Sequence, residues 1–252
     1  MSTETNKKLY LTAKGNGIYT YVIGSVEPPQ MISVTGVFGF TAVIRKGQTL
    51  YMAAQGDGGI YSYEIDSVNR PAPVRNNRNY GFRAMVLIGN TLYLTTAGND
   101  GVWSYDLDGS MPPQQIPETA GYGFNAIANI GNKLYLTAKD DGGIYVFELN
   151  SVNKPTQIAP TAGFGFVGLL VKDGNDLVMT GSDKGIWSYT IGTSDKPDQY
   201  SRTAAYGFTS IIADGSMFYL TAAGNDGVWQ FNEIEVTQIV PTATLGFIGL
   251  TK

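Results

Sequence analysis

The stretch FNAIANIGNKLYLTAKDDGGIYVFELNSVNKPTQIAP, residues 124–160, decides the fold. It contains four short apolar runs, at 124–130, 134–138, 143–149 and 156–160, separated by clusters of Gly, Asn, Asp and Pro. Runs of this length between such turn residues are typical of β-strands joined by tight connections. We therefore predict a unit of four antiparallel strands.

This unit recurs along the whole chain. A Gly followed by Ile or Val, an aromatic residue, any residue and a second aromatic residue occurs six times, every 42 residues, at Gly17, Gly59, Gly101, Gly143, Gly185 and Gly227. A Gly-Phe pair recurs with it and ends at Phe40, Phe82, Phe124, Phe166, Phe208 and Phe247. Its last interval is 39 because the connection at 232–236 is short. Repeats of about 40 to 45 residues with four strands are blades of β-propellers.

We accordingly predict an all-β protein, one six-bladed propeller domain over residues 1–252, with residues 1–6 as a disordered tail. The chain begins with the second kind of strand, at 9–12, and ends with the first kind, at 247–252. The last strand is therefore expected to join the N-terminal blade and close the ring. Closure of this kind leaves no unpaired sheet edge at the seam.

Charge and composition exclude several classes of function. The formal net charge is −4, so a broad basic face for nucleic acid is not expected. The sequence contains no Cys and no His, which removes disulfides, thiolate chemistry, imidazole bases and the commonest zinc ligands. The acidic run 140–142 lacks the alternating oxygen ligands of an EF-hand loop. We expect no metal and no cofactor.

The N-terminal region also bears on location. Residues 1–8 are polar, and no stretch approaches the roughly 20 apolar residues of a membrane helix. As written, the sequence predicts a cytoplasmic protein without membrane insertion. If a leader was removed, an extracellular or cell-surface location is expected instead.

Most of the aromatic residues are expected to pack between blades. Twelve occupy alternate positions of the third strand, where a spacing of two places both rings on one face of the sheet. They are Tyr19, Tyr21, Tyr61, Tyr63, Trp103, Tyr105, Tyr145, Phe147, Trp187, Tyr189, Trp229 and Phe231.

A second set of aromatic residues precedes the Gly-Phe pair, in the connection from the outermost strand of one blade to the innermost strand of the next. This set is Phe38, Tyr80, Tyr122, Phe164 and Tyr206. The loop between the second and third strands opens onto the same face, because strands alternate direction. That loop carries Asp57, Asn99, Asp100, Asp141, Asp183, Asn225 and Asp226. Asn and Asp before Gly favour tight turns, and beside Tyr they also suit a sugar or another small polar ligand.

Blades three and six are the first candidates for discrete sites. Both carry the segment Ala-Gly-Asn-Asp-Gly-Val-Trp, at 97–103 and 223–229. The two copies are 126 residues apart, half of the ring, so they are expected to face each other across the axis.

The central channel offers a different candidate. The residues that follow the repeated Phe are Thr41, Arg83, Asn125, Val167, Thr209 and Ile248. Only Arg83 and Asn125 are strongly polar, and no carboxylate recurs in this row. A hydrolytic propeller usually needs acids or a metal at the mouth of its channel, so the row argues against an enzyme. A site built from non-repeated residues stays open.

The repeat resembles the LVIVD repeat family. An apolar-Tyr-apolar strand, a Gly-rich turn, a Gly-apolar strand and a Pro-containing exit carry the likeness, for example Leu92-Tyr93-Leu94 through Gly101-Val102 to Pro112-Pro113, and Leu134-Tyr135-Leu136 through Gly143-Ile144 to Pro155. The resemblance implies a propeller of bacterial or archaeal surface proteins. The third strand departs from that family, since Trp103 and Tyr105 stand where it has aliphatic residues. The loops that carry the aromatic-Gly-Phe motif are also similar to those of small propeller lectins.

Together these patterns favour a non-enzymatic recognition module, a multivalent lectin-like propeller that binds glycans or a small polar ligand at shallow sites. One alternative is a scaffold for a protein partner. The other is a lyase or isomerase that uses the channel through Arg83, Asn125 and non-repeated acids.

Overall fold

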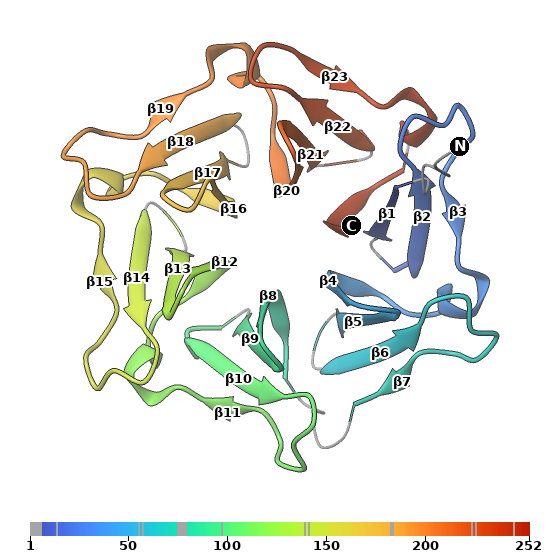
Figure 1. Ribbon diagram of the computed structural model, residues 1–252, viewed down its shortest axis with the longest axis horizontal. Coiled ribbons are helices and arrows are strands. Elements are labelled where there is room, and N and C mark those ends of the chain that lie inside the picture. The colour runs from blue at the N-terminus through green and yellow to red at the C-terminus, as the bar shows by residue number, and fades with distance from the viewer. Residues whose placement is uncertain are drawn as a thin grey trace, which may run out of the picture.

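The computed structural model describes residues 7–252 apart from positions 14, 55, 57, 75–79, 97, 139, 141, 182, 183, 223, 225 and 244. The described residues form six four-stranded antiparallel sheets arranged around a central opening (Figure 1). This confirms the predicted six-bladed β-propeller. The expected tail at residues 1–6 lies outside the described residues.

The innermost and second strands of the blades agree closely with the predicted apolar runs. The innermost strands are β24 (Phe247–Thr251), β4 (Phe40–Lys46), β8 (Phe82–Ile88), β12 (Phe124–Ile130), β16 (Phe166–Lys172) and β20 (Phe208–Asp214). The second strands are β1 (Lys8–Ala13), β5 (Thr49–Ala54), β9 (Thr91–Thr96), β13 (Lys133–Ala138), β17 (Asp176–Gly181) and β21 (Met217–Ala222).

The third strands also match, whereas the outermost strands are shorter than expected. The third strands are β2 (Ile18–Val22), β6 (Ile60–Glu64), β10 (Val102–Asp106), β14 (Ile144–Glu148), β18 (Ile186–Thr190) and β22 (Val228–Phe231). The outermost strands are β3 (Gln30–Met31), β7 (Ala72–Pro73), β11 (Gln114–Gln115), β15 (Thr156–Gln157), β19 (Asp198–Gln199) and β23 (Val236–Gln238).

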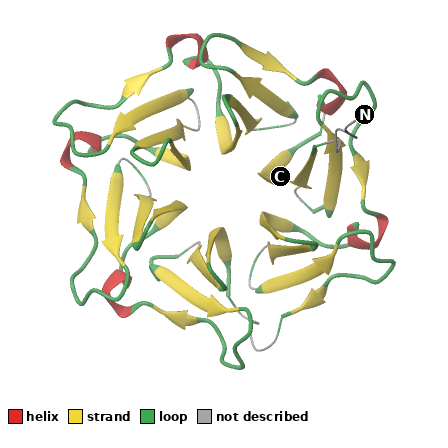
Figure 2. Ribbon diagram, viewed as in Figure 1, coloured by secondary structure: helices red, strands yellow, loops and turns green. Residues whose placement is uncertain are grey.

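The shortening has a local cause. The run predicted as a strand at 156–160 ends at Gln157, because a 3₁₀ turn, η3 (Ala159–Thr161), begins two residues later. Pro160 within it has no N–H to donate to a strand ladder. Equivalent turns in the described chain are η1 (Ser33–Thr35), η2 (Pro117–Thr119), η4 (Ser201–Thr203) and η5 (Val240–Thr242), drawn as short helices after the outermost strands (Figure 2).

The two ends of the chain share one blade. We number as blade 1 the sheet β24-β1-β2-β3, and as blades 2 to 6 the sheets that follow in chain order. Strand β24 pairs antiparallel with β1, with Leu250 opposite Leu11 and Thr251 opposite Tyr10. This confirms the predicted closure of the ring by its C-terminal strand.

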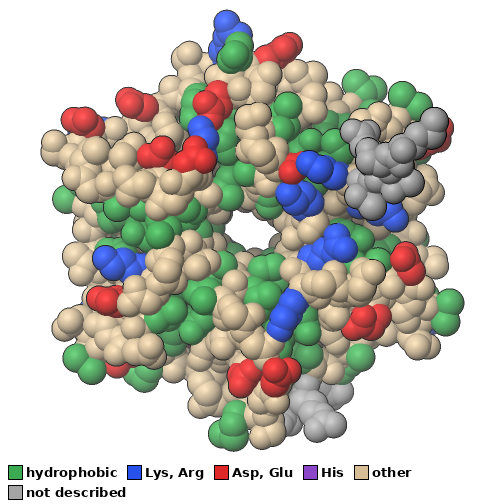
Figure 3. Space-filling model, viewed as in Figure 1, with side chains coloured by type: hydrophobic (Ala, Val, Ile, Leu, Met, Phe, Trp, Pro, Cys, Tyr) green, Lys and Arg blue, Asp and Glu red, His purple; other side chains and the backbone are tan. Residues whose placement is uncertain are grey.

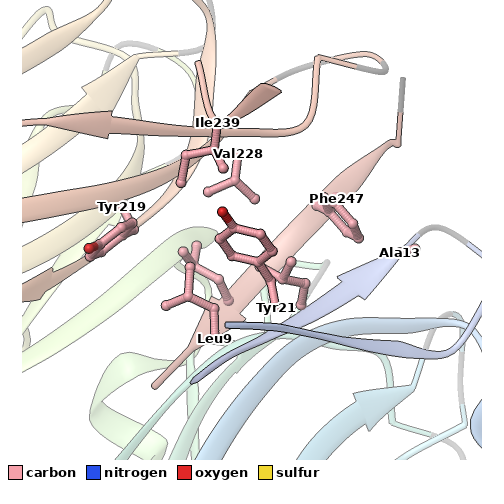
Figure 4. Close-up of a cluster of buried hydrophobic side chains, with 9 residues drawn as sticks. Leu9, Ala13, Tyr21, Tyr219, Val228, Ile239 and Phe247 are labelled. Atoms are coloured by element: carbon pink, nitrogen blue, oxygen red, sulfur yellow. The ribbon is translucent and has the colours of Figure 1, made fainter. Parts of the chain in front are cut away.

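Apolar packing between neighbouring blades builds the core. At the seam, Leu9, Tyr21 and Phe247 of blade 1 form one buried cluster with Tyr219 and Val228 of blade 6 (Figure 4). Similar clusters join the other neighbouring blades. The third-strand aromatic residues lie in or against these clusters, as the sequence pattern predicts. Within the described ranges, no helix has the length and apolar character needed to cross a bilayer.

An ion-pair group crosses the same seam. Asp214, at the end of β20 in blade 6, accepts hydrogen bonds from Lys7 Nζ at 2.8 Å and from Lys252 Nζ at 2.9 Å. The Asp214 side chain is only 13% exposed, so its charge is poorly solvated without these partners. The two ammonium groups hold the pKa of the Asp214 carboxyl below its usual range.

Deleting residues 247–252 is expected to lower the melting temperature by more than about 10 °C, because several kcal/mol of packing and strand pairing are lost and each kcal/mol is worth roughly 2–4 °C at this size. Differential scanning calorimetry measures the change. Phe247→Leu keeps the strand pairing and serves as the control, with a smaller loss. Equal melting temperatures for the deletion and the intact chain would contradict closure.

Asp214→Asn is expected to lower the free energy of unfolding at pH 7 by about 1 kcal/mol, the upper range for surface ion pairs, because the partner lysines Lys7 and Lys252 are 62% and 45% exposed and solvent screens their charges. The folded pKa of Asp214 is depressed, so the carboxylate's contribution is present above the unfolded pKa of roughly 3.9. It is lost as pH falls through the folded pKa. In urea titrations, the free energies of unfolding of the variant and the original protein should therefore differ at pH 7 and converge at pH 2.5. Asp195→Asn, at an exposed position without an ion pair among the described residues, should change neither value.

Candidate functional site

Two kinds of connection meet on one face of the ring, which we call the loop face. They are the loop between the second and third strands, and the connection from the outermost strand to the next blade. Gly143 N in the loop of blade 4 donates to Phe164 O in the connection at 3.0 Å, and Gly101 N donates in the same way to Tyr122 O at 3.0 Å. The convergence predicted from strand direction is therefore confirmed.

A buried threonine fixes the connection to its own blade. The hydroxyl of Thr161 accepts a hydrogen bond from Ile144 N at 2.8 Å and donates one to Ile158 O at 2.7 Å. The side chain is fully buried, as are its equivalents Thr35, Thr119, Thr203 and Thr242. Sequence reasoning missed this residue, although it follows the marker glycine by 18 positions in blades 1, 3, 4 and 5.

The marker glycine is needed for the same contact. Gly143 has φ +70, and a Cβ at this position would lie 2.3 Å from the carbonyl oxygen of Thr161. A side chain would therefore meet both an unfavourable backbone conformation and a backbone atom. The repeated glycine lets the loop and the connection approach within hydrogen-bond distance.

The five connection aromatic residues are half-buried in clusters with the next blade. Tyr122 stacks on Phe124, with ring centroids 5.7 Å apart, and meets the edge of Tyr145 at 5.5 Å. Phe38, Tyr80, Phe164 and Tyr206 pack in the same way. Packing thus accounts for most of each ring, and only a part is left for contact with a ligand.

Blades 3 and 6 hold matching Tyr–Trp pairs. The centroids of Tyr80 and Trp103 are 4.8 Å apart with their planes at 56°, and those of Tyr206 and Trp229 are 4.9 Å apart at 55°. These blades lie on opposite sides of the central opening (Figure 1). The predicted arrangement of the two repeated segments is confirmed.

The two pairs differ in one hydrogen bond. Trp229 Nε1 donates to Asp226 O at 3.1 Å, whereas Trp103 Nε1 is buried and has no partner within the described part of the chain. The buried hydroxyl of Thr96, at the start of the same loop in blade 3, also lacks a partner there. Buried donors are seldom left unpaired, so these two atoms mark the blade 3 loop as unusual.

The polar loop residues are only partly described. Asn99, Asp100 and Asp226 are exposed, while Asp57, Asp141, Asp183 and Asn225 lie outside the described residues. The backbone of the loops is held by glutamines of the outermost strands: Gln115 Nε2 donates to Asp100 O at 2.8 Å, and Gln238 Nε2 to Asp226 O at 2.7 Å. The exposed carboxylates are therefore presented on a fixed backbone.

The two channel candidates contact each other. In each innermost strand the ladder shifts register after the repeated Phe, for example between Phe82 and Ala84, and such a bulge redirects the extra residue. Arg83 Nη1 donates to Asn125 Oδ1 at 2.9 Å, and Asn125 Nδ2 donates to Phe166 O of the next blade at 3.2 Å.

These residues lie in the lining of a 390 Å³ cavity along the axis, which opens at the centre of the ring (Figure 3). Among the described residues that line it, Arg83 is the only charged one. In the same described ranges no three acidic side chains come together as a possible metal site. The channel can therefore attract an anion, but this lining offers no carboxylate to act as a base.

No family model matches the sequence, and no curated protein matches it. The resemblance to the LVIVD repeat family is thus not confirmed. Solved structures do share the fold. A chain of the nidogen/laminin complex aligns with a TM-score of 0.69 and 12% identity over 97% of both chains.

Two further solved structures share the propeller fold. Virginiamycin B lyase from Staphylococcus aureus has a TM-score of 0.66 and 15% identity over 94% of this chain and 83% of its own. The extracellular domain of BT4673 from B. thetaiotaomicron has a TM-score of 0.63 and 14% identity over 99% of this chain and 36% of its own. At these identities the likeness establishes the propeller fold alone.

Thr161→Val is expected to lower the free energy of unfolding by about 1–3 kcal/mol, because it leaves the N–H of Ile144 buried without an acceptor. Thr161→Ser keeps the hydroxyl and removes one methyl group, so it should cost only about 0.8 kcal/mol. Urea denaturation followed by tryptophan fluorescence measures both. A serine variant less stable than the valine variant would show that the Thr161 hydroxyl does not hold the connection to its blade.

Proposed function

We propose that the protein is a non-enzymatic recognition module that binds carbohydrate at shallow sites on the loop face, chiefly at blades 3 and 6. The observation that carries the proposal is the pair of matching Tyr–Trp clusters on opposite sides of the ring, each beside an exposed acidic loop.

The chemistry of these residues suits a sugar. A pyranose ring presents an apolar face of C–H groups and a rim of hydroxyls, so it needs an aromatic surface beside hydrogen-bonding groups. Tyr80 and Trp103 supply the aromatic surface at blade 3. Asn99 and Asp100 supply amide and carboxylate groups on a backbone held by Gln115. Little ordering of the protein is then needed on binding, which favours affinity.

Two sites on a rigid ring favour dense glycan surfaces. Each shallow site alone is expected to bind weakly, but simultaneous contact can raise the apparent affinity by about 10²–10⁴-fold when the spacing of the glycans allows it. An extracellular or cell-surface target would suit this use. Alternatively, the loop face binds a single protein partner and the ring serves as an interaction scaffold.

Chemistry in the channel is the alternative from the enzyme class. Arg83 could hold an anionic group there, with Asn125 as its neighbour. The described lining lacks a carboxylate, so a lyase or isomerase would have to draw its base from elsewhere in the chain. Binding on the loop face is the better supported of the two.

Binding should depend on the two acidic loops. We expect labelled protein to retain glycans on an array, and isothermal titration with a retained glycan to give two sites per chain. Asp100→Ala should remove one site, and the double variant with Asp226→Ala should remove both, because each carboxylate accepts hydrogen bonds from sugar hydroxyls.

Lys184 provides the matched control. It precedes Gly185 in blade 5 as Asp100 precedes Gly101 in blade 3, and Lys184→Ala should leave both sites intact. An array that retains no glycan, or titrations that both acidic variants leave unchanged, would overturn the proposal. Dependence of a catalytic activity on Arg83 alone would favour the channel instead.

A further inference from the structure

A second pocket lies on the face opposite the loop face, between blades 1 and 2. It has a volume of 510 Å³, and Lys7, Lys8, Arg45 and Lys252 line it together with Tyr10 and Asp66. Lys and Arg side chains gather beside the central opening over the blades of β1 and β4 (Figure 3). This concentration of positive charge is unexpected in a chain with a net charge of −4.

The charge breaks the symmetry of the repeat. Lys252 and Arg45 hold the same position at the end of the innermost strand in neighbouring blades, since Leu250 and Val43 pair equivalently with Leu11 and Met52. The other four blades have uncharged residues at this position: Leu87, Asn129, Val171 and Ala213. Packing of the propeller therefore does not require a cation here.

Lys8 breaks the pattern in a second way. It begins the second strand of blade 1 opposite Val22. The segment Lys8–Ala13 has the same sequence as Lys133–Ala138 in blade 4, where Lys133 lies opposite Glu148. Blade 1 thus has the lysine, but the residue opposite it on the neighbouring strand is not an acid.

The positive charges of the pocket are only partly neutralised. Asp214 holds Lys7 and Lys252, whereas Lys8 and Arg45 form no ion pair with any described residue. Counting Asp66 and Asp214, these side chains leave an excess of two positive charges. Arg45 Nε donates to Gly47 O at 2.8 Å, which fixes the guanidinium and leaves its terminal N–H groups available.

Tyr10 completes the pocket. The Arg45 guanidinium lies 5.7 Å from the centroid of the Tyr10 ring. The Tyr10 phenol is protonated at neutral pH, as that of any ordinary tyrosine is, and burial raises its pKa further, so its hydroxyl can donate a hydrogen bond. The pocket therefore combines a fixed guanidinium, flexible ammonium groups and a neutral donor.

We propose that this pocket binds a compact tetrahedral oxyanion with two negative charges, either the phosphate group of a small monoester or a free sulfate ion. Arginine forms paired hydrogen bonds with two oxygens of such a group, and lysines add point charges around it. The site is separate from the loop face, so oxyanion binding can be tested independently of carbohydrate binding.

Titration calorimetry with inorganic phosphate and with inorganic sulfate, at pH 7.4 and about 20 mM ionic strength, tests the proposal while screening is weak. We expect one site per chain for each ion. Arg45→Gln and Lys8→Gln should each weaken binding about fivefold, the loss expected for one cation near a protein surface. Neither residue holds Asp214, so the seam stays intact.

Lys133→Gln is the matched control, because Lys133 has the same strand position as Lys8 but lies in blade 4, away from the pocket. It should leave the affinity unchanged, and Arg45→Lys should restore part of what Arg45→Gln loses.

A change to pH 5.5 distinguishes the two sources of the oxyanion, because inorganic phosphate takes up a proton between pH 7.4 and pH 5.5 and loses most of its second charge, whereas sulfate keeps both charges. Phosphate should then bind more weakly while sulfate binds at least as well. Absence of binding heat for both ions, or equal losses in the Lys8 and Lys133 variants, would overturn the proposal.

Discussion

Each blade shares its hydrophobic core with its two neighbours, and this constraint determines the rest of the structure. The buried clusters hold side chains from adjacent blades, as Tyr21 of blade 1 and Tyr219 of blade 6 do at the seam. A four-stranded sheet that buries both faces needs a partner on each side, so an open row of blades would expose apolar surface at its ends. Pairing of β24 with β1 removes those ends. The ring in turn makes a rigid platform for loops that need no core of their own.

The sequence was sufficient for the architecture because the fold repeats one pattern six times. Gly143 and Phe124 recur at fixed spacing, and a repeated residue is visible without coordinates. Thr161 recurs too, but its role depends on the position of a hydroxyl between two backbone groups, which apolar periodicity does not indicate. The outermost strands were predicted too long because β-propensity does not register a 3₁₀ turn that begins two residues after Gln157.

The candidate site was predictable to a lesser degree, for a physical reason. The identical segments at 97–103 and 223–229 pointed to blades 3 and 6, and the Tyr–Trp geometries agree with that choice. The hydrogen bond of an indole N–H in these loops depends on small displacements of the loop backbone. Because the two segments have the same sequence, the difference between Trp103 and Trp229 could not be predicted from it. The partly buried state of Tyr122 was equally hidden, because a ring in a connection can lie over solvent or over Phe124.

Departures from the repeat are more informative about function than the repeat itself. A residue repeated from blade to blade can be explained by packing, which acts alike in each, as for the Gly143–Thr161 contact and its equivalents in blades 1, 3, 5 and 6. A feature confined to one or two blades needs another explanation. Lys8 with no acid opposite it, the cations at Arg45 and Lys252, and the unpaired Trp103 donor are of this kind. They fall on opposite faces of one rigid ring. Since the shared core couples every blade to its neighbours, the faces of the ring can vary independently only where their side chains take no part in that core. The exposed side chains of Lys8 and Arg45 meet this condition.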